Sequence, residues 1–224
     1  MVYMRSAPHK VERLPTASFG AQGQALDSAI ETIRLGEVIV YPTETFYGMG
    51  ADALSPAALD RLFALKGREP GKPVALIAAD AHSAFELARE ISDAARRLAD
   101  AFWPGPLTLV LPARDDLPAP LIGPDGGVGV RVSSHPIARA LAAGLGRPIT
   151  ATSANLAGGQ PARTLGEARD TFGAKVKVYL EGGKLAASAP STVVACDRNG
   201  WRVLRAGVIS DGAIAAALSG EGLR

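Results

Sequence analysis

The alternation of two apolar periods along the chain is the feature that most constrains its fold. Apolar residues recur at helical spacing over 26–33, and the run stops at Gly36, a residue favoured just beyond the end of a helix. The segment EVIVY (37–41) then has the continuous apolar character of a buried strand. A helix that leads into a strand, repeated along a chain, is typical of α/β proteins, in which helices cover a sheet.

The same two periods place the remaining elements. Strands are expected at 73–78, 107–111, 128–132, 148–152, 176–180, 191–196 and 201–205. Helices are expected at 55–67, 81–90, 92–102, 136–144, 164–172 and 210–219. We therefore predict a three-layer α/β fold on one mixed sheet, with a single domain over 21–224. Residues 1–20 lack either period and contain two prolines, which predicts an N-terminal arm.

Composition excludes several classes of protein. Hydrophobic residues make up 47% of the chain, which is enough for a substantial core and excludes a disordered protein. The formal charge is only +2, so any anion site must be local. The single cysteine cannot form an internal disulfide, and it forms no zinc pattern with the three histidines. With no apolar stretch of about 18 residues and no signal-peptide pattern, we predict a soluble, cytoplasmic protein that does not enter a membrane.

The segment YPTETFYGMGADA (41–53) is the most informative for function. It follows a predicted strand, yet it places the hydroxyls of Thr43 and Thr45, the carboxylate of Glu44 and the phenol of Tyr47 beside flexible glycines. A plain turn needs one or two such residues, whereas several together can surround a small polar ligand such as an amino acid. The segment therefore favours a ligand-binding loop over an ordinary turn.

The segment KGREPGKP (66–73) concentrates positive charge between a predicted helix and strand. Lys66, Arg68 and Lys72 match the charge of a polyphosphate, and the two glycines let backbone N–H groups approach its oxygens. A solvated basic turn is an equally good interpretation of these residues alone. A P-loop is disfavoured, because Pro73 occupies the place of the Ser or Thr that would hold magnesium.

Other polar residues lie at the ends or in the interior of predicted strands. Ser153 and Asn155 in ITATSAN end a strand, where α/β sheets usually bind ligands, although a capped turn explains them as well. Arg131 interrupts the apolar alternation of GVRV, so it either faces solvent or pairs with an anion such as a carboxylate. Ser191 lies where a later strand begins, and Arg205 precedes a glycine turn.

Common catalytic motifs are missing from the sequence, which contains no G-x-S-x-G, G-x-G-x-x-G or H-E-x-x-H pattern. His82 and His135 are expected on a helix face and in a turn rather than as an acid/base pair. Cys196 is expected in the core, and Trp103 and Trp201 are expected to pack rather than to stack on a ligand.

Seven motifs, in order, resemble those of the YrdC-like family of threonylcarbamoyl-adenylate synthases. They are YPTETFYGMGADA, KGR followed by KP, WPGPLTLVL, GVRV, TSAN, PSTVV and VLRAG. The similarity spans about residues 24–210. The resemblance implies an open, twisted mixed sheet flanked by helices, with a concave basic cavity. It also implies a nucleotidyltransferase that joins L-threonine, bicarbonate and ATP into threonylcarbamoyl-AMP and pyrophosphate. The product would serve tRNA modification, through tRNA or the downstream tRNA-modifying transferase complex.

The resemblance assigns roles to individual residues. On the ATP side it implies contacts from Lys66, Arg68, Lys72, Ser153, Asn155 and Arg205. On the threonine side it implies Thr43, Thr45, Tyr47, Arg131 and Ser191. Lys66 and Arg68 are the expected catalytic residues. Magnesium is expected to enter with ATP, held by phosphate oxygens and water rather than by side chains, and no organic cofactor is expected.

The chain departs from the family pattern at three positions. Glu69 and Ala206 replace prolines in two loops, and Ile77 stands where members often carry a histidine near threonine. The last difference predicts an altered threonine pocket.

Three other functions compete with the synthase. One is a paralogue that uses the cavity weakly or differently, and another is an RNA-binding protein whose basic concave face grips a nucleic-acid backbone. A hydrogenase-maturation carbamoyltransferase is disfavoured, because those chains are much longer and carry zinc-finger cysteines.

Overall fold

The computed structural model describes residues 19–67, 72–186 and 189–219. In this part of the chain the α-helices are α1 (Phe19–Arg34), α2 (Pro56–Lys66), α3 (Ala81–Phe85), α4 (Asp93–Phe102), α5 (Pro136–Leu145), α6 (Leu165–Phe172) and α7 (Asp211–Ser219). The strands are β1 (Ile39–Tyr41), β2 (Gly48–Gly50), β3 (Leu76–Ile77), β4 (Leu107–Pro112), β5 (Gly127–Arg131), β6 (Ile149–Thr150), β7 (Thr152–Ser153), β8 (Val178–Tyr179), β9 (Thr192–Asp197) and β10 (Gly200–Arg205). Two short 3₁₀ helices, η1 (Ala119–Leu121) and η2 (Gly173–Lys175), complete the elements.

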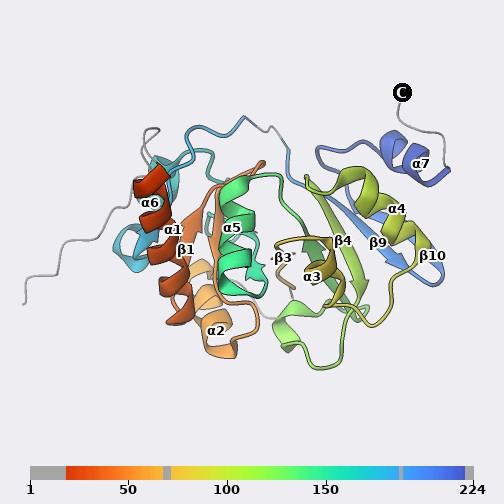
Figure 1. The fold of residues 1–224 in the computed structure, drawn as a ribbon, viewed down its shortest axis with the longest axis horizontal. Coiled ribbons are helices and arrows are strands. Elements are labelled where there is room, and N and C mark those ends of the chain that lie inside the picture. Colours follow the sequence, from red (N-terminus) through yellow and green to blue (C-terminus); the bar gives the residue numbers. More distant parts are fainter. Residues whose placement is uncertain (1–18, 68–71, 187–188, 220–224) are drawn as a thin grey trace, which may run out of the picture.

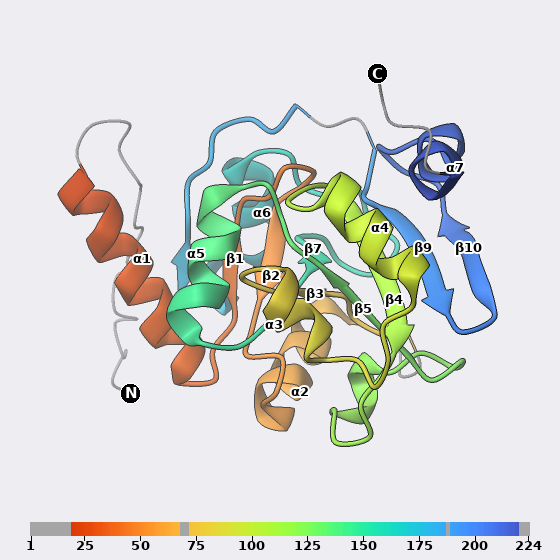
Figure 2. The ribbon, with the colours of Figure 1, turned by 45° about the vertical axis from the view of Figure 1, so that its right-hand side comes forward.

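The α/β class is confirmed, but the strands form two mixed sheets rather than one. The first sheet has the order β7-β2-β1-β8, and the second has the order β10-β9-β4-β5-β3-β6. Figure 1 shows the first sheet beside α1 and α2, the second beside α4 and α7, and α5 between them. The view in Figure 2 keeps α4 beside the second sheet and shows α5 next to α1.

The segment predicted as one strand, 148–152, is divided between the two sheets. Its first part, β6, pairs antiparallel with β3, whereas β7 pairs antiparallel with β2 of the first sheet. Between them Ala151 donates its N–H to the carbonyl of Ala75. One short segment thus contributes a strand to each sheet. The periodicity of its own residues cannot reveal this division.

The buried side chain of Thr150 adds a second connection at this crossing point. Its Oγ1 donates to the carbonyl of Met49 at 2.9 Å and accepts the N–H of Ala51 at 2.9 Å. Its own N–H donates to the carbonyl of Ala51, and its carbonyl accepts the phenol of Tyr41 at 2.8 Å. Four hydrogen bonds of one residue therefore attach the crossing segment to the first sheet.

Most helix boundaries agree with the predictions, and α2 shows the reason. Ser55 accepts the N–H of Ala58, Pro56 occupies the first turn, and the helix ends at Gly67 with a φ of 58°, a conformation that favours glycine. These local signals set the position of Lys66 at the end of the helix.

Other elements also differ from the predictions. The strand β2 was not predicted, because its GMG sequence lies inside the polar loop segment. The predicted strand 73–78 is reduced to β3, and the predicted helix 81–90 ends at Phe85. The backbone beyond α3 instead pairs with the end of β4, where Ala88 and Ala113 form a β-bridge. The predicted arm over 1–20 lies almost wholly outside the described residues, and α1 begins at Phe19.

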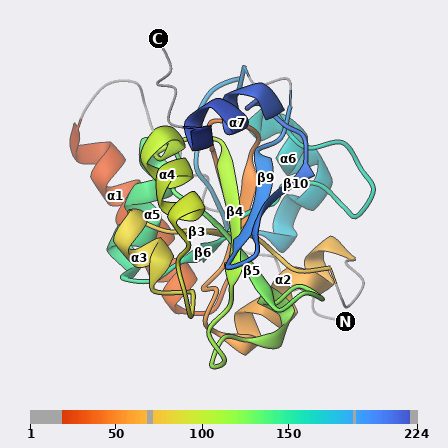
Figure 3. The same ribbon diagram turned by 90° about the vertical axis from the view of Figure 1, so that its right-hand side faces the viewer.

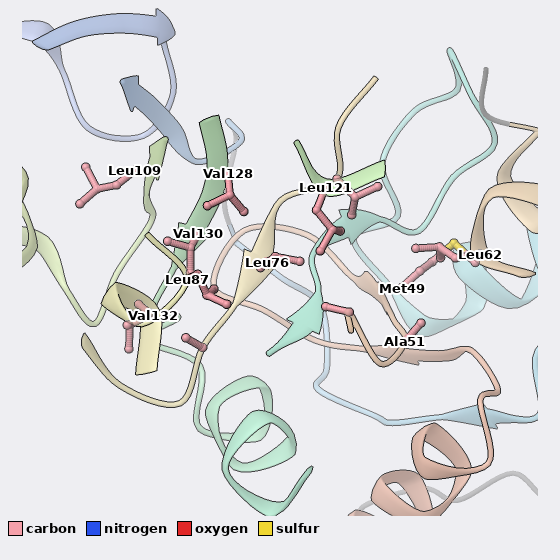
Figure 4. Close-up of a cluster of buried hydrophobic side chains, with 14 of the residues drawn as sticks. Met49, Ala51, Leu62, Leu76, Leu87, Leu109, Leu121, Val128, Val130 and Val132 are labelled. Atoms are coloured by element: carbon pink, nitrogen blue, oxygen red, sulfur yellow. The ribbon is translucent and has the colours of Figure 1, made fainter. Parts of the chain in front are cut away.

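The principal hydrophobic core spans both sheets. Figure 4 shows Met49 and Leu62 at one end of this cluster and Leu109 and Val130 at the other. A second cluster lies between α1, α5 and the first sheet, and it contains Tyr41, Leu141 and Ile77, which is fully buried there.

The single-residue predictions are mostly confirmed. Cys196 is buried, and Trp103 packs against Phe85 with ring centroids 5.7 Å apart. His82 lies on α3, and His135 is the N-cap of α5. The packing role of Trp201 is wrong, because this residue is 43% exposed on β10 at the edge of the second sheet.

None of the helices in the described ranges is both long and apolar enough to cross a bilayer.

We predict that Thr150→Val lowers the free energy of unfolding by about 1–3 kcal/mol, because it leaves a buried N–H and a buried carbonyl without their partner. Chemical denaturation followed by circular dichroism measures this change. Thr171→Val is the matched control, since the exposed Thr171 hydroxyl donates only to the preceding turn of α6. Equal stability of the two variants would contradict the bridging role of Thr150.

Candidate functional site

A cavity of about 740 Å³ opens on one face of the second sheet. Its size lies in the range of small-molecule sites, roughly 300–1,000 Å³. The lining comes from segments far apart in the sequence: Tyr41, 43, 45–48, 73–75, Thr108, Val110, 123–125, Gly127, Gly129, Arg131, 151–153, 160–161, 190–191, Val193, Leu204 and Arg205.

Strand alternation decides which residues face the cavity. Successive side chains on a strand point to opposite faces of the sheet. On β4, Leu109 belongs to the principal core whereas Thr108 and Val110 line the cavity. On β5, Val130 is in the core and Arg131 lines the cavity. In Figure 3, β4 and β5 stand between α3 and α4 on one side and α2 and α6 on the other.

The connection between β1 and β2 is held by its own threonine side chains. The Thr43 hydroxyl accepts the N–H groups of Thr45 and Phe46 and donates to the carbonyl of Phe46 at 2.7 Å. The hydroxyl oxygens of Thr43 and Thr45 lie 3.1 Å apart. Both side chains are buried, so this connection is a fixed wall of the cavity.

Arg131, at the end of β5, meets this wall through an ion pair. Its Nη1 donates to Glu44 Oε1 at 3.1 Å and to Thr45 Oγ1 at 3.4 Å. The other carboxylate oxygen of Glu44 accepts the Ser133 hydroxyl. Arg131 is only 6% exposed, and a buried guanidinium requires such a partner.

The cavity lining also contains a second guanidinium, that of Arg205, and two further hydroxyls. Arg205 Nη2 donates to the Ser191 carbonyl at 2.8 Å and to Ser191 Oγ at 3.1 Å. The hydroxyls of Ser191 and Thr108 hydrogen-bond at 3.0 Å. Partial burial lowers the pKa of Arg205, and the positive charge of Arg131 lowers it further. The positive charge of Arg131 thus acts on Arg205, and both guanidiniums line the same cavity.

Three residues of the predicted ATP side form one unit next to the cavity. Lys66 Nζ donates to the carbonyls of Ser153 at 2.5 Å and Asn155 at 2.8 Å. Ser153 Oγ donates to Asn155 Oδ1, and Asn155 Nδ2 donates to the carbonyls of Leu156 and Gly159. The end of α2 thus orients the turn after β7.

The predicted site residues fall into three groups. Those that line the cavity are Thr43, Thr45, Tyr47, Arg131, Ser153, Ser191 and Arg205. Within the described ranges, those that lie outside the lining are Lys66, Lys72 and Asn155. Arg68 lies outside the described residues. Ile77 also lies outside the lining, because it is packed into the second cluster, and its effect on the threonine pocket stays a prediction.

Tyr47 lines the cavity, but its hydroxyl is directed to the turn that follows β8. The phenol donates to the carbonyl of Gly183 at 2.8 Å and accepts the N–H of Gly182 at 2.9 Å. Glu181 Oε1 lies 3.3 Å from the same oxygen. In this structure the phenol therefore holds residues 181–183 against the cavity wall.

Several residues in the cavity lining or in contact with it were missed by the sequence predictions. Thr108 is a polar residue on the second face of an otherwise apolar strand, and this signal was available in LTLVL. Asp125 and Gln160 lie in loops whose distance from the cavity cannot be read from local patterns. Glu44 was noted only as part of the loop, and its pairing with Arg131 is a contact between the two sheets.

The fold and the cavity define an α/β protein with a ligand site lined by hydroxyls and two guanidiniums. A family model for Sua5, YciO and YrdC, described as telomere recombination, matches residues 31–207. The chain belongs to this Sua5/YciO/YrdC family.

Relatives carry the synthase name. A threonylcarbamoyl-AMP synthase of Thiobacillus denitrificans is 41% identical over 174 residues, covering 78% of this chain and 91% of the relative. A threonylcarbamoyl-AMP synthase of Pyrococcus abyssi is 39% identical over 162 residues, covering 72% of this chain and 48% of the relative. The match thus spans about half the length of this second relative. These names do not favour the RNA-binding alternative.

A solved structure supports the same family. The crystal structure of P. abyssi Sua5 complexed with L-threonine superposes with a TM-score of 0.86 at 32% identity. The match covers 93% of this chain and 61% of that chain.

We predict that Tyr47→Phe lowers the free energy of unfolding by about 1–2 kcal/mol at neutral pH, because two main-chain groups lose their partner. Burial raises the pKa of Tyr47 from 10.0 to about 12. The neutral phenol is therefore favoured in the folded state, and its contribution is complete below the unfolded pKa and lost as the pH rises through the folded value.

Denaturant titrations between about pH 9 and pH 12 test this linkage. The variant should lose less stability than the wild type as the pH rises over this window. An identical pH dependence of the two proteins would contradict it.

Proposed function

We propose that the chain is an L-threonylcarbamoyladenylate synthase, a nucleotidyltransferase. The single observation that carries the proposal is the convergence of Arg131 and Arg205, with the hydroxyls of Thr45 and Ser191, on one cavity. Two cations and several hydroxyls suit a ligand that combines a carboxylate with phosphates. The relatives that carry the synthase name, and the Sua5 structure complexed with L-threonine, support the choice of substrates.

The proposed reaction needs positioning and charge neutralisation more than acid/base chemistry. The amine of threonine attacks CO2 derived from bicarbonate, loses a proton and forms a carbamate. A carbamate oxygen then attacks the α-phosphorus of ATP, and the bond to the β-phosphate oxygen breaks, which releases pyrophosphate. Negative charge moves onto the leaving group, so fixed cations near the phosphates lower the barrier.

The residues divide between the two substrates. We assign the threonine carboxylate to Arg131, with Thr43, Thr45 and Ser191 around the amino acid, and the phosphates to the Arg205 end. Charge-assisted hydrogen bonds from a guanidinium are well suited to either anion. Tyr47 contributes by shaping the wall through its bonds to residues 182–183.

The α2 end supplies the remaining ATP contacts. We propose Lys66 and Arg68 as the catalytic cations and Lys72 as a further phosphate contact. The hydrogen bonds of Lys66 to the carbonyls of Ser153 and Asn155 support this grouping, because they join the helix end to a turn that borders the cavity.

Magnesium is proposed to accompany ATP. The described residues contain no group of three or more His, Cys, Asp or Glu side chains that could hold a metal. Phosphate oxygens and water would then be its ligands, a common arrangement for this ion. We also propose that the chain acts in the cytoplasm and that its product passes to tRNA through the downstream transferase complex.

We predict that AMP and pyrophosphate form from ATP only when L-threonine and bicarbonate are both present. Lys66→Ala and Arg68→Ala should each reduce this turnover at least about 100-fold, because cations that stabilise the departing phosphate contribute roughly two to three powers of ten. Separation of the nucleotides and a pyrophosphate assay measure it. Turnover that continues unchanged without threonine would exclude the synthase function.

We predict that Arg205→Ala lowers kcat/KM for ATP about 10- to 100-fold, the effect of one charged hydrogen bond. Arg198→Ala is the matched control, because Arg198 lies on the same hairpin and pairs with Glu90 at the surface. Steady-state kinetics with varied ATP compare the two variants. Similar values for both would remove Arg205 from the phosphate side.

A further inference from the structure

The two guanidiniums that line the cavity differ in how their charge is compensated. Arg131 pairs with the carboxylate of Glu44 at 3.1 Å. Arg205 donates to Ser191, and among the described residues no carboxylate pairs with it. The Arg131 end therefore carries little net charge, whereas the Arg205 end carries a full positive charge.

The two members of this ion pair differ in their relation to the cavity. Arg131 is part of the lining, but Glu44 is not. Its two oxygens are occupied by Arg131 and by the hydroxyl of the fully buried Ser133. Ser133 is held in turn by the N–H of His135 at 3.1 Å, at the start of α5. This chain of contacts fixes the carboxylate and, through it, the guanidinium.

We propose that Glu44 is a specificity-determining positioning residue, which reserves the Arg131 end of the cavity for a carboxylate and keeps polyphosphate away from it. The proposal rests on the proposed function, since it concerns how the threonine and phosphate ends of the same site are kept distinct.

The basis of this selectivity is electrostatic and geometric. Two adjacent uncompensated arginines would attract a polyphosphate to either end, because each binds phosphate well. A fixed carboxylate at one end weakens the attraction for a multiply charged anion there more than for a singly charged one. An amino-acid carboxylate still gains from hydrogen bonds to a guanidinium whose orientation is already set.

The test uses Glu44→Gln, which keeps the size of the side chain and removes its charge. Calorimetric titration without ATP should show L-threonine binding weakened at least about tenfold, the effect of one misplaced charged hydrogen bond. Inorganic pyrophosphate should compete with threonine about tenfold more strongly in this variant than in the wild type. A merely structural role would not increase binding of pyrophosphate.

Glu37→Gln is the matched control, because Glu37 pairs with Arg61 and Lys177 at the surface and lies outside the cavity lining. Both of its affinities should equal those of the wild type. Glu44→Asp serves as a second variant in case the Gln variant does not fold. It keeps the charge but is too short to reach both Arg131 and Ser133, so it should weaken threonine binding without strengthening pyrophosphate competition.

The outcomes separate the two proposals. Unchanged threonine affinity in Glu44→Gln, or in Glu44→Asp where the first variant is unfolded, would overturn the role of Glu44. So would a loss of threonine binding in Glu44→Gln with no gain for pyrophosphate. A wild-type protein that binds threonine but forms no AMP would overturn the synthase function alone, whereas one that binds no threonine would overturn both.

Discussion

The crossing of the chain between its two sheets, at residues 149–153, is the constraint on which the rest of the structure depends. β6 completes the second sheet, and β7 completes the first only two residues later. Thr150, buried at this point, makes four hydrogen bonds to the first sheet. In an apolar interior each of these groups must be satisfied, so the relative position of the sheets is strongly determined. The cavity lies beside this crossing, and its lining includes residues 151–153.

The site itself is a set of long-range contacts between rigid elements. The β1–β2 connection, the end of β5 and the start of β9 each present one or two polar groups, and buried hydrogen bonds fix each group before any ligand arrives. Preorganised cations and hydroxyls lose little entropy when they bind, which is how such a site can stabilise developing charge without a general base. The surroundings of His135 are consistent with a site that works without a general base. Burial lowers the pKa of its imidazole, and Nδ1 accepts an N–H at the start of α5.

Two residues that were predicted to contact a ligand make hydrogen bonds to main-chain groups of the protein. The Tyr47 phenol holds the turn at residues 181–183, and the Lys66 ammonium holds the turn at residues 153–155. Each bond fixes a loop that borders the cavity. Polar residues that shape a site and polar residues that touch a ligand therefore occur in the same motifs, because a ligand-binding loop must itself be held in place.

The sequence by itself determined most of the elements, the α/β class and seven of the residues that line the cavity. Local signals were sufficient for this. The two ends of α2 are set by Ser55, Pro56 and Gly67, and the polar residues of 41–53 indicated a wall of the cavity. Only the tertiary structure decided that 148–152 belongs to two sheets, that Glu44 pairs with Arg131, and that Thr108 joins Ser191. Periodicity reports which face of an element is buried, but it carries no information on which distant element covers that face. Such pairings arise from packing and from the need to satisfy buried charges, and both are properties of the assembled chain.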